Sequence, residues 1–313
     1  MKIALDVTGG DFAPEINLEG AAAAARELPD DTQICLIGQE DSILPFLEAQ
    51  NSLQNRFEFV KAEQVIEMGE NPTRALSQKR DSSILVGFQL LKEKKASVFC
   101  SAGNTGAMHV GAMLTIKAIE GVLRPAIVGF SPKLHGGYGL VLDIGANADC
   151  KPEVLVQFGE LGSIYCQYVL GINNPKVGLM NMGKEEKKGP VNLQSTYQLL
   201  RITRDLNFIG NLEGRDLLNE KADVIVCDGF IGNVILKLAE SFYDMLKARG
   251  LTDSVIEGFN YEAIGGSPIL GLNGNVIICH GSSSGLAIKN SLLMAHKMAQ
   301  SNIHERIRDV FAR

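Results

Sequence analysis

The chain has 313 residues, of which 45% are hydrophobic and 21% are charged, a balance that is typical of a folded globular protein and excludes a disordered chain. It carries 30 Lys and Arg residues against 36 Asp and Glu residues, a formal net charge of −6. This acidic balance argues against a basic surface for nucleic acid, so we expect no nucleic-acid partner.

Short apolar runs recur along the chain, and each is followed by a loop and a helical pattern. This alternation predicts an α/β fold with three layers (α/β/α), in which helices cover both faces of a mainly parallel sheet. Helices are expected at 14–28, at 81–92 with Asp81 as the cap, and from Pro152 onward. The predicted strands span residues 2–6, 32–38, 96–101, 125–130, 139–145, 176–183, 223–229 and 275–281.

The chain contains no internal repeat and no low-complexity linker. The turn-rich stretch SPKLHGGYG at residues 131–139 is the best candidate for a boundary between lobes. We therefore predict one unit, residues 1–313, with one lobe made of 1–130 and 270–313 and the other of 131–269.

Six predicted strand ends share one formula, in which glycine and a polar side chain come between the strand and a helix. In an open parallel sheet, such loops line the crevice where ligands bind. The alternative for any single loop is that glycine, Asp and Asn are simply what tight turns require. The polar residues at these ends are Asp6 and Asp11, Ser101 with Asn104 and Thr105, Asp143 with Asn147 and Lys151, Lys184–Lys188, Asp228 with Asn233, and His280 with Ser282–Ser284.

The clearest of these loops is SAGNTGA at residues 101–107. A strand that hands over at once to glycines and a new helix points several backbone N–H groups at one place, which suits an anion. No Lys follows Gly106, so the loop is not a nucleotide P-loop.

The six cysteines are scattered and form no C-x-x-C pair, so we expect neither a metal site nor a disulfide framework. The segment MKIALD at the start lacks the apolar region of a secretion signal, which favours a cytoplasmic location. The dinucleotide fingerprint G-x-G-x-x-G is also missing. We expect no cofactor.

A competing signal is GSSSG at residues 281–285, which fits the nucleophile elbow of serine hydrolases. Ser283 would be the nucleophile and His280 a possible base, although the acid and histidine that follow in hydrolases are poorly placed here. A hydrolase of thioesters or esters using Ser283 therefore stays open, as does a non-catalytic module that binds phosphate or a nucleotide.

Several stretches in the same order resemble the bacterial phosphate acyltransferases of phospholipid synthesis, the PlsX type. They are DVTGGDFAPE (6–15), SAGNTGA (101–107), DIGANADCKPE (143–153), LEGRD (212–216), CDGFIGNVILK (227–237) and GLNGNVIICHGSS (271–283). The resemblance implies a fold like that of isocitrate dehydrogenase and phosphotransacetylase, with two lobes around a cleft.

The resemblance also implies the reaction. An acyl group would pass from acyl-acyl-carrier-protein, carried on its phosphopantetheine arm, to inorganic phosphate, giving acyl phosphate and free carrier protein. It further implies a homodimer and peripheral contact with the inner face of the cell membrane.

We assign hypothetical roles to the loop residues on this basis. Phosphate needs orientation more than a base, and the thiolate is a fair leaving group, so the main demand is for donors to the developing oxyanion. The candidate catalytic residues are Asn104, Thr105, Lys188 and His280. The candidate substrate-binding residues are Gly9, Gly10, Asp11, Ser101, Gly103, Asp143, Asn147, Lys151, Asn233 and Ser282.

One segment departs from the family pattern. Between Lys237 and Gly265 the chain is shorter than the family's helical hairpin that contacts lipid. One amphipathic helix remains, with Leu238, Phe242, Met245 and Leu246 on one face. We expect this face to be buried in the core or in a dimer.

Overall fold

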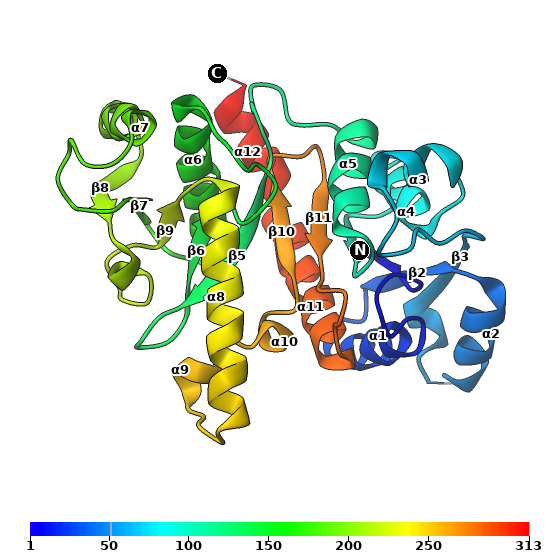
Figure 1. Cartoon of the computed structure of the whole chain (residues 1–313). Coiled ribbons are helices and arrows are strands. Elements are labelled where there is room, and N and C mark those ends of the chain that lie inside the picture. Colours follow the sequence, from blue (N-terminus) through cyan, green and yellow to red (C-terminus); the bar gives the residue numbers. More distant parts are fainter. Residues whose placement is uncertain (51, 313) are drawn as a thin grey trace. The chain divides into compact units, whose positions relative to one another are not determined.

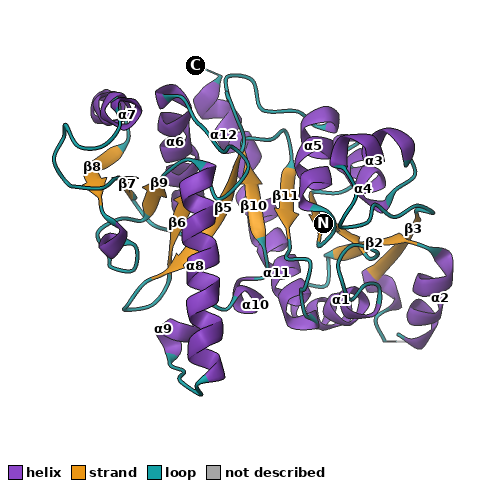
Figure 2. Ribbon diagram, viewed as in Figure 1, coloured by secondary structure: helices purple, strands orange, loops and turns teal. Residues whose placement is uncertain are grey.

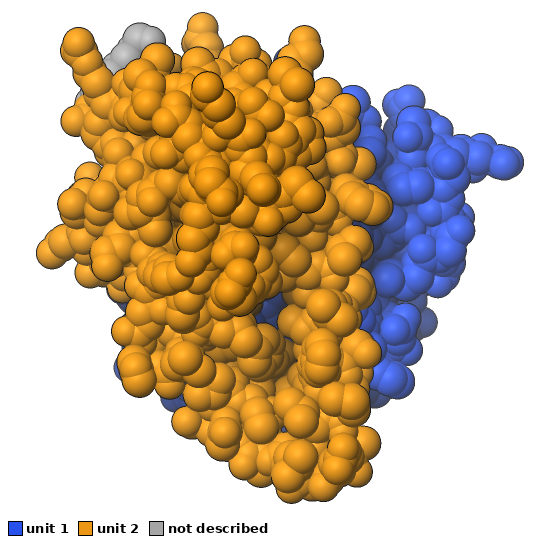
Figure 3. Space-filling model, turned by 60° about the vertical axis from the view of Figure 1, so that its left-hand side comes forward, with its two compact units in different colours: residues 1–118, 261–304 blue, residues 119–260, 305–313 orange. Residues whose placement is uncertain are grey.

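The structure is a computed structural model that describes residues 1–50 and 52–312. The chain forms two compact units, 1–118 with 261–304 and 119–260 with 305–313, which are coloured separately in Figure 3. The lobes proposed from the sequence stay a prediction. They differ from these units in the segments 119–130, 261–269 and 305–313.

The first unit contains six strands in the order β3-β2-β1-β4-β11-β10. All neighbouring pairs are parallel except β10 and β11, which are antiparallel. The predicted runs at 2–6, 32–38, 96–101 and 275–281 all form strands, whereas β3 and β10 were not predicted. The strands are β1 (Lys2–Asp6), β2 (Gln33–Gly38), β3 (Phe57–Lys61), β4 (Val98–Ser101), β10 (Ser267–Leu270) and β11 (Asn275–Ile278).

Helices cover both faces of this sheet, as Figures 1 and 2 show, with α3, α4 and α5 on one side and α1, α10 and α11 on the other. Small residues allow the close packing: a side chain at Gly20 of α1 would collide with Ile288 of α11. The helices are α1 (Glu15–Glu27), α2 (Glu40–Ala49), η1 (Gln54–Arg56), α3 (Pro72–Gln78), α4 (Ser83–Lys92), α5 (Thr105–Thr115), α10 (Tyr261–Ile264) and α11 (Gly285–Ser301).

The helix at 81–92 begins later than predicted. Its cap position is Ser82, and the expected cap Asp81 instead accepts a hydrogen bond from the backbone N–H of Glu63 at 3.0 Å. A carboxylate two residues ahead of a helix is too far away to reach its free N–H groups, so the neighbouring loop takes it.

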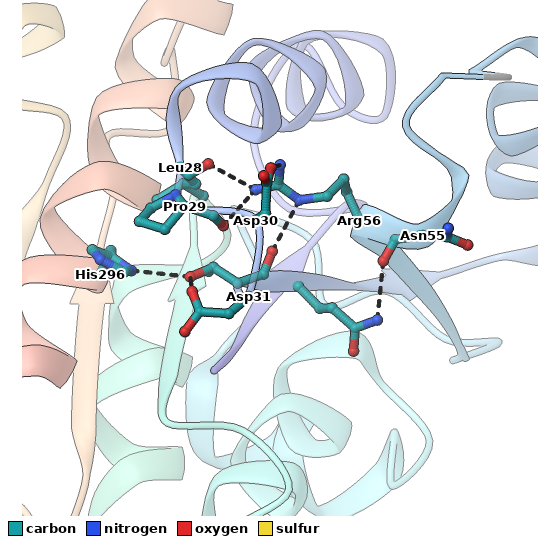
Figure 4. Close-up of polar contacts among 9 residues, drawn as sticks. Leu28, Pro29, Asp30, Asp31, Asn55, Arg56 and His296 are labelled. Carbon is teal, nitrogen blue, oxygen red and sulfur yellow. Dashed lines mark hydrogen bonds and ion pairs between the residues drawn. The ribbon is translucent and has the colours of Figure 1, made fainter.

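The turn between α1 and β2 is fixed by Arg56, whose guanidinium bonds three backbone carbonyls (Figure 4): those of Leu28 at 2.9 Å, Pro29 at 2.8 Å and Thr32 at 3.2 Å. His296 of α11 lies 3.3 Å from the Thr32 hydroxyl. Burial lowers the pKa of His296. This contact ties the far end of α11 to the start of β2.

The second unit has five strands in the order β5-β6-β9-β7-β8, antiparallel between β5 and β6 and parallel elsewhere. The predicted run at 125–130 corresponds to β5. The strands predicted at 139–145, 176–183 and 223–229 are shorter in the structure, because each ends before the glycine at the end of its run. The strands are β5 (Ala126–Pro132), β6 (Tyr138–Leu142), β7 (Lys176–Met180), β8 (Asn207–Leu212) and β9 (Val224–Val226).

Opposite faces of this second sheet are covered by α6 and α8. A side chain at Gly162 of α6 would contact Leu142, whereas the preceding residue of β6, Val141, lines a cavity beside α8. Successive strand residues point to opposite faces, so the two helices lie on different sides. The helices are α6 (Pro152–Tyr168), α7 (Val191–Ile202), η2 (Gly214–Asp216), α8 (Gly229–Ala248) and α9 (Ser254–Glu257), and α12 (Ile303–Phe311) joins the units in sequence.

The apolar face predicted on α8 is present, but it is not buried in the core of the chain. Leu238, Phe242 and Met245 remain 57%, 53% and 47% exposed. The prediction that this face is buried in the core is therefore wrong. The reason is that α8 packs on the sheet mainly at its N-terminal end, where Gly229 and Gly232 allow a close approach. Among the described residues, no helix is both long and apolar enough to cross a membrane.

All six cysteines are free and buried. Burial raises the pKa of Cys35, Cys150 and Cys166 to about 12 and that of Cys279 to about 11. The thiols therefore stay protonated near neutral pH.

Candidate active site

The carboxyl ends of β1, β4 and β11 lie side by side, because these three strands are parallel neighbours. The loops that follow them are in direct contact. The N–H of Asp11 donates to the carbonyl of Gly281 at 2.8 Å, and a Cβ on Gly9 would lie 2.7 Å from the backbone nitrogen of Gly103. The sequence predicted this gathering of strand ends.

Gly9 and Gly10 are needed for this approach. A Cβ on Gly9 would lie 2.5 Å from the Asp6 carboxylate, and Gly10 has a φ of +107° with the Gly281 carbonyl 3.1 Å from its missing Cβ. Only glycine adopts that backbone conformation without strain. The two residues therefore let the first loop contact the other two, while the Asp11 side chain stays exposed.

The Asp6 carboxylate links the loop after β1 to the end of β4. Its carboxylate accepts hydrogen bonds from Ser101 Oγ at 2.7 Å and from the backbone N–H and hydroxyl of Thr8, each at 3.0 Å. Burial is the main influence on this carboxyl and raises its pKa, although the hydroxyl and N–H donors oppose that shift. Asp6 is one of the polar strand-end residues of the sequence but not one of the candidate site residues, and its place at the end of β1, three residues before Gly9, was the signal for it.

Ser101 and Gly103 serve this network and do not face a ligand. The Ser101 hydroxyl is fully buried, donates to Asp6, and accepts the N–H of Gly103 at 3.0 Å. Both groups thus have protein partners. The substrate-binding role predicted for them is replaced by one of positioning the loop.

Asn104 caps α5, with its Oδ1 accepting the N–H of Ala107 at 2.9 Å. Its Nδ2 donates to the carbonyls of Glu67, Met68 and Glu70 at 3.0–3.1 Å. A side-chain amide has only two N–H bonds to give, so nothing remains for an oxyanion. The predicted donor role of Asn104 is wrong, because the amide fastens the 67–70 loop to the start of α5.

The free donors at this site are the first backbone amides of α5. Thr105 and Gly106 are the first two residues of the helix, so their N–H groups have no carbonyl within the helix to bond. Thr105 is also exposed. The helix dipole adds a partial positive charge at the same point. The phosphate predicted for this turn from the sequence stays a prediction, and the two amides are compatible with it.

His280 and Ser282 form a second polar group on the β11 loop. Nδ1 of His280 lies 2.8 Å from Ser282 Oγ and accepts the N–H of Ser282 at 3.3 Å. Tyr261 lies against the imidazole, with ring centroids 5.1 Å apart, and its hydroxyl reaches Ser282. Because Nδ1 accepts, we assign the neutral tautomer with hydrogen on Nε2, which makes the exposed edge of the ring a donor.

Ser283 is not paired with this histidine ring. Ser283 as a whole is 3% exposed, and its hydroxyl donates to the carbonyl of His280 at 2.6 Å. A serine nucleophile requires a base within hydrogen-bond reach of its hydroxyl. The geometry therefore argues against the hydrolase that uses Ser283.

In the second unit, Asp143 follows β6 and is fully buried. Its carboxylate accepts the N–H of Ile127 at 2.9 Å, the N–H of Asn147 at 2.6 Å and the Asn147 side chain at 3.1 Å. Burial is the largest influence on this group and raises its pKa against these donors. Asp143 is therefore a loop organiser whose oxygens already have partners.

Asn147 and Asn233 have different neighbours. The amide of Asn147 also donates to the carbonyl of Pro125 at 2.8 Å, so it belongs to the same structural network. Asn233 is exposed on the first turns of α8 and donates to the Ile144 carbonyl at 3.3 Å. Of the two, Asn233 keeps donor capacity for a ligand.

The two candidate lysines come from separate loops. Lys151 is exposed at the N-cap position of α6. Lys188 is also exposed, and its aliphatic part covers Gly183, whose missing Cβ would lie 2.8 Å from Lys188 Cγ. Across residues 1–50 and 52–312, no cluster of three or more His, Cys, Asp or Glu residues has the arrangement of a metal site.

Comparison with solved structures identifies the fold. The chain is similar to a phosphotransacetylase from Streptococcus pyogenes, with a TM-score of 0.65 and 17% identity over 96% of this chain and 94% of that one. It is also similar to a branched-chain phosphotransacylase from Enterococcus faecalis V583, with a TM-score of 0.64 and 14% identity over 96% and 99%. The fold is thus the α/β fold of the phosphotransacetylases, as predicted.

Sequence relatives define the family. A family model described as "Fatty acid synthesis protein" matches residues 1–255. The phosphate acyltransferase of Heliobacterium modesticaldum is 44% identical over 99% of this chain and 97% of its own length, and that of Dictyoglomus turgidum is 43% identical over 98% and 96%. The chain belongs to the phosphate acyltransferase family and is an acyltransferase.

Proposed function

We propose that this enzyme transfers an acyl group from acyl-acyl-carrier-protein to inorganic phosphate and so supplies acyl phosphate for phospholipid synthesis. The observation that carries the proposal is the set of three loops at the ends of β1, β4 and β11, where the free amides of α5 meet glycines that admit a ligand. The family membership and the motif resemblance support the same reaction.

Phosphate would bind at the start of α5, held by the N–H groups of Thr105 and Gly106 and by the Thr105 hydroxyl. A phosphate oxygen attacks the thioester carbon, the new C–O bond forms as the C–S bond breaks, and the thiolate leaves. Orientation by fixed N–H groups supplies most of the catalysis, because the nucleophile is already an anion and the thiolate leaves readily.

The Nε2–H of His280 would donate to the oxygen that gains charge in the transition state. Ser282 and Tyr261 hold the ring for this task. Removing one such donor lowers turnover by roughly 10²-fold to 10³-fold. In the second unit, the exposed Lys151, Lys188 and Asn233 would bind anionic and polar groups of the substrate, and Asp143 with Asn147 would fix the loop beside the start of α8.

The partners and the location belong to the same proposal. The donor would be the acyl carrier protein, the enzyme would act as a homodimer in the cytoplasm, and contact with the membrane would be peripheral. The segment from Gly285 onward carries five Lys or Arg residues against two acidic ones, which suits an acidic carrier protein.

The test is incubation of the purified enzyme with hexadecanoyl-acyl-carrier-protein, with and without phosphate, followed by mass spectrometry of protein and products. We expect thioester loss only with phosphate, acyl phosphate as the product, and no acylated enzyme. Phosphate-independent loss with acyl-serine would support a hydrolase, and an intact thioester would support a binding module.

Two matched variants sharpen this test. Ser283→Ala should retain phosphate-dependent turnover, because its hydroxyl bonds only a loop carbonyl. His280→Gln should lose roughly 10²-fold in kcat. The opposite ranking would contradict the proposed site.

A further inference from the structure

Asn17 is a buried polar residue in the first turn of α1, and it has no part in the roles assigned above. It is only 3% exposed, whereas the other buried residues of α1 are Leu, Gly and Ala. Asn is a weaker helix former than Ala, and a buried amide lowers stability unless it is hydrogen-bonded. The reason for an Asn at this position therefore lies outside α1.

The side-chain amide of Asn17 is bonded to the loop that follows β1. Its Nδ2 donates to the carbonyls of Val7 and Gly9, each at 2.8 Å, and the carbonyl of Asp6 lies farther away, at 3.4 Å. An amide has only two N–H bonds to give, so this loop takes both of them. Two carbonyls of the loop are thereby turned toward α1.

The direction of these carbonyls fixes the direction of the next N–H groups. The links Val7–Thr8 and Gly9–Gly10 are trans, and in a trans peptide the C=O and the following N–H point in opposite directions. The Val7 carbonyl faces Asn17, and the Thr8 N–H accordingly donates on the other side, to the Asp6 carboxylate at 3.0 Å. By the same geometry, the Gly10 N–H is directed away from Asn17.

The Gly10 N–H lies where the three strand-end loops meet. The missing Cβ of Gly10 would lie 3.1 Å from the Gly281 carbonyl and 3.2 Å from the Cβ of Ala102, so Gly10 contacts the loops that lead to α11 and to α5. Gly10 is half-buried, and within residues 1–50 and 52–312 its N–H has no hydrogen-bond partner, unlike that of Asp11. It is a further free donor at this site, besides the amides at the start of α5.

The Gly9–Gly10 pair does not hold this orientation by itself. Glycine has the widest conformational freedom of all residues, so neighbouring groups must fix the peptide between the two glycines. The bond from Asp11 to Gly281 fixes the far end of the loop, and Asn17 holds the Gly9 carbonyl. Asn17 therefore determines where the Gly10 N–H points.

We propose that Asn17 is a positioning residue for acyl transfer, which directs the Gly10 N–H at the carbonyl oxygen of the thioester. The proposal rests on the proposed function. The Gly10 N–H and the Nε2–H of His280 donate to this oxygen as the C–O bond to phosphate forms, and the carbonyl is restored as the C–S bond breaks and the thiolate leaves. Fixed donors of this kind stabilise the charged oxygen without having to reorganise.

The first test replaces the donors of Asn17 while keeping a branched side chain of similar size. For Asn17→Leu we expect kcat of the phosphate-dependent reaction with hexadecanoyl-acyl-carrier-protein to fall by roughly 10²-fold, because a small displacement of the donor is enough for such a loss. The KM for phosphate should stay unchanged, since the α5 amides are untouched. Asn17→Ala should lose kcat to the same extent, because neither variant has an N–H to give.

The matched control is Asn275→Leu. Asn275 is also 3% exposed and its Nδ2 donates to the carbonyl of Ser97 at 3.1 Å, but it lies at the start of β11, at the opposite end of the strand from the site. This variant should lose stability and keep the wild-type kcat. Equal losses of kcat in the two Leu variants, or a full kcat in Asn17→Leu, overturns the proposal.

The second test observes the Gly10 N–H in the wild-type protein and needs no turnover. Glycine labelled with ¹³C at the carbonyl and with ¹⁵N gives carbonyl-to-amide signals only from the Gly–Gly links, which are 9–10, 136–137 and 265–266. The probe is carrier protein whose phosphopantetheine thiol bears a trifluoroacetonyl group, because the hydrated ketone of this group is tetrahedral. We expect a downfield shift of the Gly10 amide proton in the wild type, a smaller shift in Asn17→Leu, and none at Gly137. An unmoved Gly10 signal in the wild type overturns the proposal.

The two proposals fail in different ways. Wild-type protein that consumes no thioester in the presence of phosphate refutes the acyl transfer. Wild-type turnover together with an undiminished kcat in Asn17→Leu refutes only the role of Asn17.

Discussion

Asp6 in the first unit and Asp143 in the second are alike in position but differ in their partners. Each is fully buried at the end of a strand, and burial raises the pKa of each. Asp6 is bonded mainly by hydroxyls, those of Ser101 and Thr8. Asp143 is bonded mainly by backbone N–H groups and one side-chain amide.

The kind of donor that bonds each aspartate determines how much its loop can move. Backbone donors fix the loop after β6 in one shape. Hydroxyl donors can rotate, so the loops around Asp6 can adjust while their N–H groups receive an anion. The second unit should therefore lose stability when its aspartate is removed, and the first should lose stability less and phosphate binding more.

The largest effect is expected from Asp143→Ala. It leaves the N–H groups of Ile127 and Asn147 buried without partners, each at about 1–3 kcal/mol, so the free energy of unfolding should fall by about 3–5 kcal/mol. Urea unfolding followed by circular dichroism measures it. The control Asp228→Ala removes one cap bond to Ile231 and should lose only about 1 kcal/mol. Similar losses of unfolding free energy in the two variants would contradict the role of Asp143 as the organiser of its loop.

Ser101→Ala is expected to have an intermediate effect. It removes one donor from Asp6 and the acceptor of the Gly103 N–H, so we expect a loss of about 2–3 kcal/mol in unfolding free energy. The KM for phosphate should rise more than kcat falls, because the loop is displaced while the α5 amides remain. A pure loss of kcat would show that the hydroxyl contacts reacting atoms.

Asn104→Ala should destabilise the protein by about 1–2 kcal/mol, since it removes a helix cap and releases the 67–70 loop. Asn104→Asp keeps the capping oxygen but not the donors to Glu67, Met68 and Glu70, and it should recover part of the loss. Thermal unfolding of both variants checks this ranking. If Asn104→Asp is the less stable of the two, the cap is not the main contribution.

The smallest effect concerns pH. The pKa of Asp6 and of Asp143 is raised in the fold, so between the usual value near 3.8 and the raised value the native protein binds more protons than the unfolded chain. The stability of the wild type relative to Asp6→Asn or Asp143→Asn should therefore shrink as pH rises from 4 to 7. Urea unfolding of each pair across that range measures the slope, and a growing difference would contradict the raised pKa values.

The sequence predicted the alternating elements well, because buried parallel strands read as continuous runs of Val, Ile and Leu. It missed β3, β8 and β10. The residues of β3 and β8 are half exposed and so lack a continuous apolar run. β10 is mostly buried, but its four residues, SPIL, begin with Ser and Pro and are too short to stand out as a strand. It placed Gly9, Gly10 and His280 together correctly as strand-end residues. It could not tell that Asn104 and Ser101 have protein partners, because these partners, at 67–70 and at Asp6, lie far away in the chain.

The six buried thiols have a consequence for an enzyme that handles thioesters. A surface thiolate would exchange with the incoming thioester and take the acyl group for itself. Here every native thiol is buried and protonated, so the activated acyl group meets no competing thiolate of the protein. A single cysteine introduced on the exposed face of α8 would also be the one site open to a maleimide dye.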